Sequence, residues 1–130
     1  MPRETHTATA DRFFAAVLWD FDGTLVDTES RWVEAELAVL ASHGVVWEPE
    51  RANEFIGGPL TDVCEAMVAD LGGSVTVDDV RRELITMVSQ FNRERDVPWR
   101  PGVLDLLIEI RDAGIPTAIV TGSAHAVVEP

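Results

Sequence analysis

Residues 13–29 read FFAAVLWDFDGTLVDTE, and this stretch decides the fold. It opens with an unbroken apolar run, Phe13–Trp19, which is typical of a strand covered on both faces of a parallel sheet. Asp20 ends the run, and Gly23 allows the chain to turn sharply away from the strand tip. The stretch therefore predicts a buried strand that carries two carboxyl groups, Asp20 and Asp22, at its carboxyl end.

The rest of the chain shows helical patterns followed by a second strand pattern. Apolar residues recur at helical spacing in four segments, and glycines follow three of them. The predicted helices are residues 29–43, 61–71, 76–95 and 102–113, and Thr76 with Asp79 resembles a capping box at the start of the third helix. The sequence PTAIVT, residues 116–121, predicts a second short buried strand. This order of strand, helical insertion, helix and strand predicts an α/β fold, a parallel βαβ unit interrupted by a small helical domain.

Bulk properties narrow the possible partners. The formal net charge is −13, so phosphate backbones and anionic lipid surfaces would be repelled, which excludes nucleic-acid and membrane-surface binding. A small anionic substrate stays possible, because a bound cation or a helix N-terminus can reverse the local potential.

The single cysteine, Cys64, is expected to be buried and fits a reducing cytoplasm. The apolar run at the first strand is too short for a membrane span, and residues 1–11 are expected to form a loose tail.

The two aspartates at the strand tip indicate phosphoryl chemistry. Open α/β sheets bind ligands in the crevice beyond the carboxyl ends of their strands, where Asp20 would point. A carboxylate near Mg²⁺ can stay ionised and attack phosphorus, while a second carboxyl such as Asp22 moves a proton. Thr121 ends the neighbouring strand, and its hydroxyl with the amides that follow would hold phosphoryl oxygens.

Two segments resemble one known family. DFDGTLVDTE, residues 20–29, resembles the first motif of the haloacid dehalogenase superfamily. RPGVLDLLIEIRDAGIPTAIVTGS, residues 100–123, resembles the second half of that pattern and ends in the second motif at Thr121. The resemblance implies a magnesium-dependent phosphatase that hydrolyses a small phosphorylated metabolite through an aspartyl-phosphate intermediate.

The resemblance also implies roles for individual residues. Asp20 would be the nucleophile and Asp22 the general acid and base, and Asp20 with the Asp22 carbonyl would bind Mg²⁺. Thr121 would hydrogen-bond the phosphoryl group, with Gly122 and Ser123 adding backbone amides. No role in binding nucleic acid or membranes is implied.

The same resemblance implies a domain organisation. Residues 1–26 and 99–130 would form part of a Rossmann-like core, its first strands only, and residues 27–98 would form an inserted helical cap. LVDTESRW, residues 25–32, is similar to members of the β-phosphoglucomutase and phosphoglycolate phosphatase type. The same motifs also serve phosphosugar mutases, which is one alternative function.

The sequence departs from the family pattern after the second motif. Family members place a lysine or arginine in a third motif and an acidic group in a fourth, whereas residues 122–130 contain no lysine, arginine or aspartate. We therefore expect a truncated phosphatase that exposes apolar strand surface and turns over slowly. The other alternative is a non-catalytic remnant that associates through its exposed sheet edge.

Several further residues allow two interpretations. Trp32 follows the first motif closely enough to line a substrate pocket, although core packing is the simpler role. Residues 57–58 are expected to form either a loop facing the active site or a plain turn between helices. His43 is expected at a helix C-terminus. Any of four arginines could contact a substrate phosphate, and no local feature selects among them: Arg51, Arg81, Arg82 and Arg100.

Overall fold

A computed structural model describes residues 15–130, and within them two short strands form a parallel sheet. They are β1 (Val17–Trp19) and β2 (Thr117–Ile119), and Val17 pairs with Thr117 and Trp19 with Ile119. The predicted parallel βαβ arrangement is therefore confirmed, and the fold is α/β. The beginning of the predicted first strand, Phe13 and Phe14, and the predicted tail at residues 1–11 lie outside the described residues.

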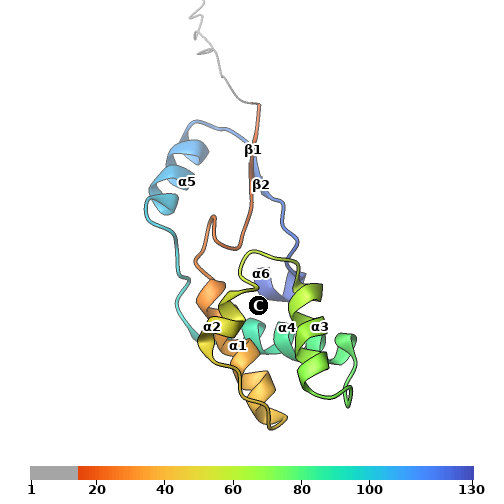
Figure 1. The fold of residues 1–130 in the computed structure, drawn as a ribbon. Coiled ribbons are helices and arrows are strands. Elements are labelled where there is room, and N and C mark those ends of the chain that lie inside the picture. Colours follow the sequence, from red (N-terminus) through yellow and green to blue (C-terminus); the bar gives the residue numbers. More distant parts are fainter. Residues whose placement is uncertain (1–14) are drawn as a thin grey trace, which may run out of the picture.

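Six helices accompany the two strands in the described part of the chain. They are α1 (Glu29–Ser42), α2 (Pro49–Asn53), α3 (Leu60–Asp70), α4 (Val77–Glu94), α5 (Val103–Asp112) and α6 (His125–Val128). Figure 1 shows α1–α4 and α6 gathered into a bundle at one end of the molecule, with β1, β2 and α5 at the other. Four of the helices match predicted segments, whereas the short α2 was not predicted. None of these helices is both long and apolar enough to cross a lipid bilayer.

Local sequence explains where the helices begin and end. The Thr76 hydroxyl accepts a hydrogen bond from the Asp79 amide at 3.1 Å, and the Asp79 carboxylate accepts one from the Thr76 amide at 3.1 Å. This reciprocal pair is the predicted capping box, and it fixes the start of α4. His43 lies at the C-cap of α1, as expected, and its Nε2 is 3.0 Å from a carboxylate oxygen of Glu83.

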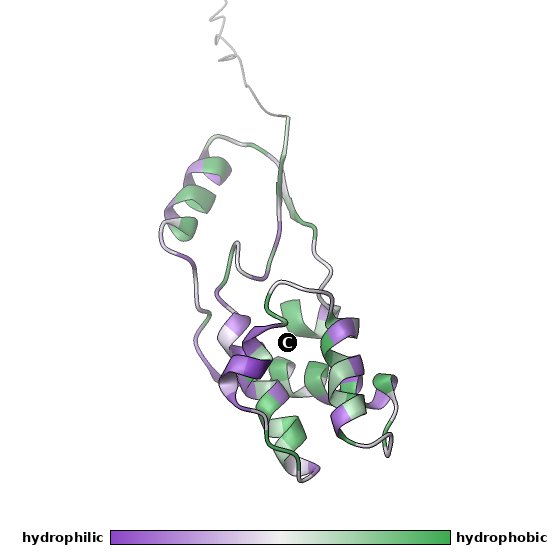
Figure 2. Ribbon diagram, in the orientation of Figure 1, coloured by the Kyte–Doolittle hydropathy of each residue, from purple (hydrophilic) through white to green (hydrophobic). Residues whose placement is uncertain are grey.

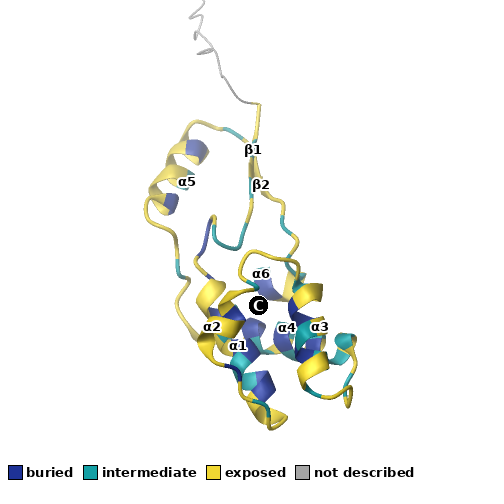
Figure 3. Cartoon of the chain, in the orientation of Figure 1, coloured by how far each residue is buried: buried dark blue, intermediate teal, exposed yellow. Residues whose placement is uncertain are grey.

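The core lies between the helices of the bundle. Its fully buried side chains come from α1, α3 and α4, and the last helix adds Val127, which is 0% exposed. Figure 3 shows these buried positions concentrated in the bundle. Cys64 is among them, as predicted. The Asn92 side-chain amide of α4 also donates to the Val127 carbonyl at 2.9 Å, so the segment after β2 is held against the bundle.

The sheet region is much less covered than the bundle. Leu18 of β1 is 67% exposed and Val120, just after β2, is 60% exposed. The prediction of strands buried on both faces was therefore wrong for the described residues, because no further strand or helical layer among them covers the two-stranded sheet. The expectation of exposed apolar strand surface is met. Figures 2 and 3 together show hydrophobic, exposed segments along β1, β2 and α5.

Candidate active site

The turn after β1 brings the first motif together. The Phe21 carbonyl accepts hydrogen bonds from three amides that follow it, and the Gly23 amide donates to the Val26 carbonyl at 2.8 Å. Gly23 has a φ of 73°, a conformation that side chains other than glycine rarely adopt. The glycine therefore permits a tight loop that places Asp22 directly beyond the strand tip at Asp20.

The chain leaves for the helical region and returns from it at neighbouring points. The Asp27 amide donates to the Pro98 carbonyl at 2.8 Å, and the Arg100 amide donates to the Leu25 carbonyl at 3.0 Å. These bonds hold the two connecting segments together close to the predicted boundaries at residues 27 and 98. The assignment of residues 27–98 as a separate cap domain stays a prediction.

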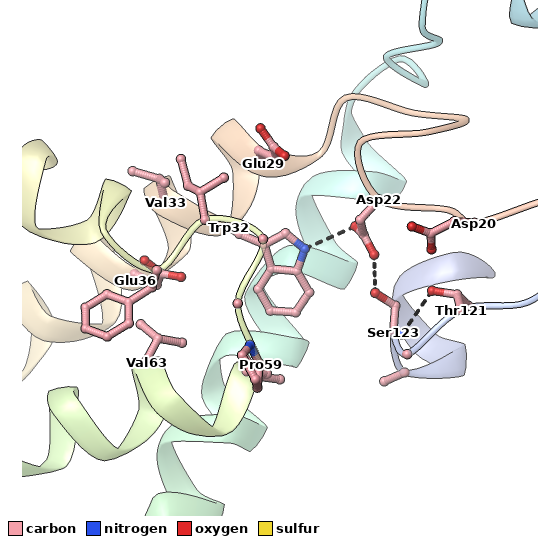
Figure 4. Close-up of a pocket in the computed structure, with 17 residues that line it drawn as sticks. Asp20, Asp22, Glu29, Trp32, Val33, Glu36, Pro59, Val63, Thr121 and Ser123 are labelled. Carbon is pink, nitrogen blue, oxygen red and sulfur yellow. Dashed lines mark hydrogen bonds between the residues drawn. The ribbon is translucent and has the colours of Figure 1, made fainter.

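A pocket of about 410 Å³ lies between the strand ends and the helical bundle, a size suited to a small ligand. The five residues predicted for the site all line it: Asp20, Asp22, Thr121, Gly122 and Ser123. The rest of the lining comes from α1, from the loop before α3 and from α3 itself. Figure 4 shows the strand-end residues on one side of the pocket and the α1 and α3 residues on the other.

Asp22 is the most constrained carboxylate in the pocket. Its Oδ1 accepts hydrogen bonds from the Thr28 hydroxyl and, at 3.3 Å, from the Trp32 indole N–H. Its Oδ2 accepts one from the Ser123 hydroxyl. Three donors from three different segments therefore fix the orientation of this carboxylate.

Asp20 is the first residue after β1 and Thr121 is the second after β2, so both lie at the carboxyl ends of the paired strands. The Val120 amide donates to the Trp19 carbonyl at 2.7 Å, so the two strand ends lie side by side. The Phe21 amide donates to Asp20 Oδ1 at 2.8 Å, and the exposed Asp20 carboxylate has no other hydrogen bond to the described residues. The Thr121 hydroxyl accepts from the Ser123 amide at 3.0 Å. Asp20 is thus the carboxylate of the pair that is available to a ligand.

Sequence reasoning missed two residues, Thr28, which supports Asp22 from outside the pocket, and Glu36, which lines the pocket. Thr28 is 1% exposed, and its hydroxyl contacts Asp22, although the threonine lies in the quoted first motif. Glu36 of α1 is 5% exposed, and its Oε2 has no hydrogen-bond partner within the described structure. Burial raises the pKa of Glu36 to about 7. The sequence feature that could have identified Glu36 is its position one helical turn after Trp32, on the same face of α1.

Some of the remaining candidate residues line the pocket and others do not. Trp32 and the loop at residues 57–58 line the pocket, and Trp32 also packs against the core of the bundle. A role for either of them in substrate binding stays a prediction. None of the four candidate arginines is among the described lining residues. Arg51 instead pairs with Glu54 at 2.8 Å, and Arg81 and Arg82 pair with acidic residues one helical turn earlier at 3.3 and 3.1 Å.

The carboxylates meet only part of what a magnesium ion requires. Mg²⁺ takes six oxygen ligands and commonly keeps several waters beside one or two carboxylates. The Asp20 carboxylate is available, whereas both Asp22 side-chain oxygens already accept hydrogen bonds, which leaves the Asp22 main-chain carbonyl as the second ligand. Within residues 15–130 no three acidic, histidine or cysteine side chains converge on one point. These oxygen ligands fit a Mg²⁺ ion that would have few protein ligands and keep water at its remaining positions.

Residues 17–130 match the model of a protein family described as haloacid dehalogenase-like hydrolases. The chain belongs to this family. It is 30% identical over 120 residues to N-acetylmuramic acid 6-phosphate phosphatase of Pseudomonas aeruginosa, a match that covers 88% of this chain and 51% of that protein. It is 28% identical over 111 residues to validoxylamine A 7'-phosphate phosphatase of Streptomyces hygroscopicus, covering 83% of this chain and 50% of the relative.

Solved structures give the same assignment. The CbbY protein of Rhodobacter sphaeroides in complex with phosphate superposes with a TM-score of 0.77 at 26% identity. That match covers 88% of this chain and 54% of the CbbY chain. The present chain therefore spans about half the length of the relatives it matches. Family membership and fold are shown by these matches, including the predicted partial core with its helical region.

Proposed function

We propose that this chain carries the phosphoryl-accepting part of a phosphatase that acts on a small phosphorylated metabolite. The observation that carries the proposal is that an exposed carboxylate, Asp20, and Thr121 line the same pocket at the ends of two adjacent parallel strands. Relatives of this family named as sugar-phosphate phosphatases support the substrate class. Location in the cytoplasm stays a prediction, as does the absence of nucleic-acid and membrane partners.

The proposed reaction has two steps. An Asp20 oxygen attacks phosphorus and forms an aspartyl-phosphate, while the bond to the leaving oxygen breaks and that oxygen takes a proton from Asp22. Asp22 then removes a proton from water as the water attacks the same phosphorus, and the bond between phosphorus and the Asp20 oxygen breaks. Inorganic phosphate is released, and both carboxyl groups return to their starting protonation states.

The neighbouring residues support these roles. The three hydrogen bonds to Asp22 hold its carboxylate beside the pocket, where a proton can pass to or from a bound oxygen. The Thr121 hydroxyl and the amides of Gly122 and Ser123 would hold phosphoryl oxygens. The Asp20 carboxylate and the Asp22 carbonyl would hold Mg²⁺, which when bound supplies positive charge against the phosphoryl oxygens.

We expect this chain to turn over slowly. Four carboxyl groups line the pocket, from Asp20, Asp22, Glu29 and Glu36, and no arginine or histidine joins them among the described lining residues. Without a cationic side chain the approach of a phosphate dianion is opposed by like charge. A missing charged partner of this kind costs about 3–4 kcal/mol of transition-state stabilisation, or roughly 100- to 1,000-fold in rate.

The direct test is turnover of p-nitrophenyl phosphate with and without Mg²⁺. We expect slow, magnesium-dependent hydrolysis by the wild-type chain and none above background by Asp20→Asn. Asp27→Asn is the matched control, because Asp27 follows in the same segment and does not line the pocket. Equal rates for wild type and Asp20→Asn would remove the nucleophile assignment.

A further inference from the structure

Glu36 is a buried carboxyl group that no described residue satisfies. Its side chain projects from α1, 5% exposed, and Oε2 makes no hydrogen bond within residues 15–130. Buried polar atoms in folded proteins are nearly always paired, and an unpaired one is expensive unless a ligand or water completes it. Because Glu36 also lines the pocket, the missing partner can be a group on a molecule bound there.

The position of Glu36 separates it from the phosphoryl chemistry. Figure 4 shows Glu36 and the strand-end aspartates on opposite sides of Trp32. Apolar side chains from α1, from the loop before α3 and from α3 line the same pocket. They include Val33, Phe55 and Val63. Glu36 is therefore the polar group at the end of the pocket remote from Asp20.

We propose that Glu36 is a specificity-determining residue that hydrogen-bonds a hydroxyl group on the substrate, at the end remote from the phosphate. The substrate class is then a hydroxyl-bearing phosphate monoester, and not a bisphosphate. This inference rests on the proposed function, because it requires the phosphate to bind at Asp20 and Thr121.

The chemistry of the pocket favours a hydroxyl over a second anion. A carboxyl group can hydrogen-bond a hydroxyl in either protonation state, as an acceptor when ionised and as donor or acceptor when protonated. The raised pKa of Glu36, about 7, means that both states are populated near neutral pH. A second phosphate dianion would instead add negative charge to a pocket that already holds Asp20, Asp22 and Glu29 beside Glu36.

The test is binding by the full chain in the presence of Mg²⁺, measured by isothermal titration calorimetry. The probes are inorganic phosphate, glucose 6-phosphate, glycerol 3-phosphate and glucose 1,6-bisphosphate. At least one hydroxyl-bearing monophosphate should bind roughly 10- to 100-fold more tightly than inorganic phosphate, the range expected for one hydrogen bond to a charged group. The bisphosphate should bind more weakly than glucose 6-phosphate.

Variants of Glu36 separate this contact from phosphate binding. Glu36→Met keeps the length of the side chain and should lose the preference for the monophosphate over inorganic phosphate, whereas Glu36→Gln should keep most of it. Both should bind inorganic phosphate like the wild type. Glu65→Gln, an exposed carboxyl change on α3, is the matched control and should alter nothing.

The outcomes distinguish the two proposals. Normal phosphate binding with an unchanged preference in Glu36→Met overturns the role of Glu36 and leaves the proposed function standing. Tighter binding of the bisphosphate than of glucose 6-phosphate by the wild type overturns the substrate class, even if Glu36→Met does not fold. Absence of phosphate binding by the wild type overturns both proposals.

Discussion

The hydroxyl of Ser123, which follows β2, donates a hydrogen bond to the carboxylate of Asp22, which follows β1, across a sequence separation of 101 residues. This contact joins the two motifs that the parallel strands place side by side. Sequence reasoning assigned Ser123 only a backbone role, whereas its hydroxyl contacts Asp22. The same carboxylate also accepts from Thr28 and Trp32, so residues on the turn, on α1 and after β2 meet at one group.

Removing the Thr28 hydroxyl should weaken both stability and the orientation of Asp22. Thr28→Val keeps the shape of the buried side chain but leaves an Asp22 oxygen with one donor fewer. Loss of a hydrogen bond to a charged acceptor should lower the free energy of unfolding by about 1–3 kcal/mol. Thermal or denaturant unfolding measures this change.

Thr24→Val is the control for that substitution. Thr24 lies in the same turn, but it is exposed and its hydroxyl makes no hydrogen bond in the described structure. Its replacement should change stability by less than about 0.5 kcal/mol. Equal losses from the two variants would contradict the assignment of Thr28 as a support for Asp22.

Glu36 should make stability depend on pH. Its pKa is about 7 in the folded protein against an ordinary value of 4.5, so the folded state holds the proton more tightly. The stability that this carboxyl contributes is complete below pH 4.5 and is lost as pH rises towards and through 7. Glutamine cannot ionise, so over that pH range the free energy of unfolding of Glu36→Gln should rise relative to that of the wild type. The expected difference is roughly 1–3 kcal/mol, which allows for partial access of the side chain to solvent.

The measurement is the melting temperature of both proteins at pH 5 and at pH 8. The advantage of Glu36→Gln over the wild type should be larger at pH 8 than at pH 5. The exposed Glu65→Gln variant should show no such difference between the two pH values. A pH-independent offset for Glu36→Gln would show that the carboxyl is not held in its protonated form by burial.

The capping box at the start of α4 should be worth about 1 kcal/mol. Thr76→Ala removes the hydroxyl that accepts from the Asp79 amide, and the helix loses its N-terminal cap. The hydrogen bonds from Thr76 also hold the pKa of Asp79 below its usual 3.8, so the stabilisation is present above that pH and is lost as pH falls. Urea unfolding at pH 6 and pH 3 should show a smaller penalty for Thr76→Ala at pH 3.

Thr86→Ala provides the comparison for the cap variant. Thr86 lies inside the same helix, and its hydroxyl donates to the Arg82 carbonyl at 2.7 Å, a bond that the helix does not need. Alanine is the better helix former there, so this change should be neutral or slightly stabilising. A penalty as large as that of Thr76→Ala would argue against a specific capping effect.

Local patterns in the sequence predicted much of the architecture. The apolar run ending at Asp20 and the segment ending at Thr121 each carry strand signals with a polar residue at the tip, and parallel pairing then brings those tips together. Thr76 and Asp79 predicted the start of α4, because a capping box depends only on residues close in sequence. The same logic explains why α4 was predicted within two residues at its start.

Features that depend on long-range packing were missed. Glu36 was not selected, because a glutamate on a helix normally faces solvent and only the fold buries it. The strands were expected to be covered on both faces because an apolar run indicates that a segment can be buried. Such a run does not indicate which other segment covers it, and the strand residues are in fact exposed. The contacts of Asp22 with Trp32 and Ser123 likewise depend on how the bundle and the strand ends meet.

The central claim is that Asp20 accepts the phosphoryl group, and covalent labelling tests it most directly. The chain is incubated with acetyl phosphate and Mg²⁺, quenched in acid and analysed by mass spectrometry of the intact protein and its peptides. The account predicts one added phosphoryl group on the peptide containing Asp20, present in Asp27→Asn and absent from Asp20→Asn. A phosphoryl group on another residue, or equal labelling of Asp20→Asn, would contradict it.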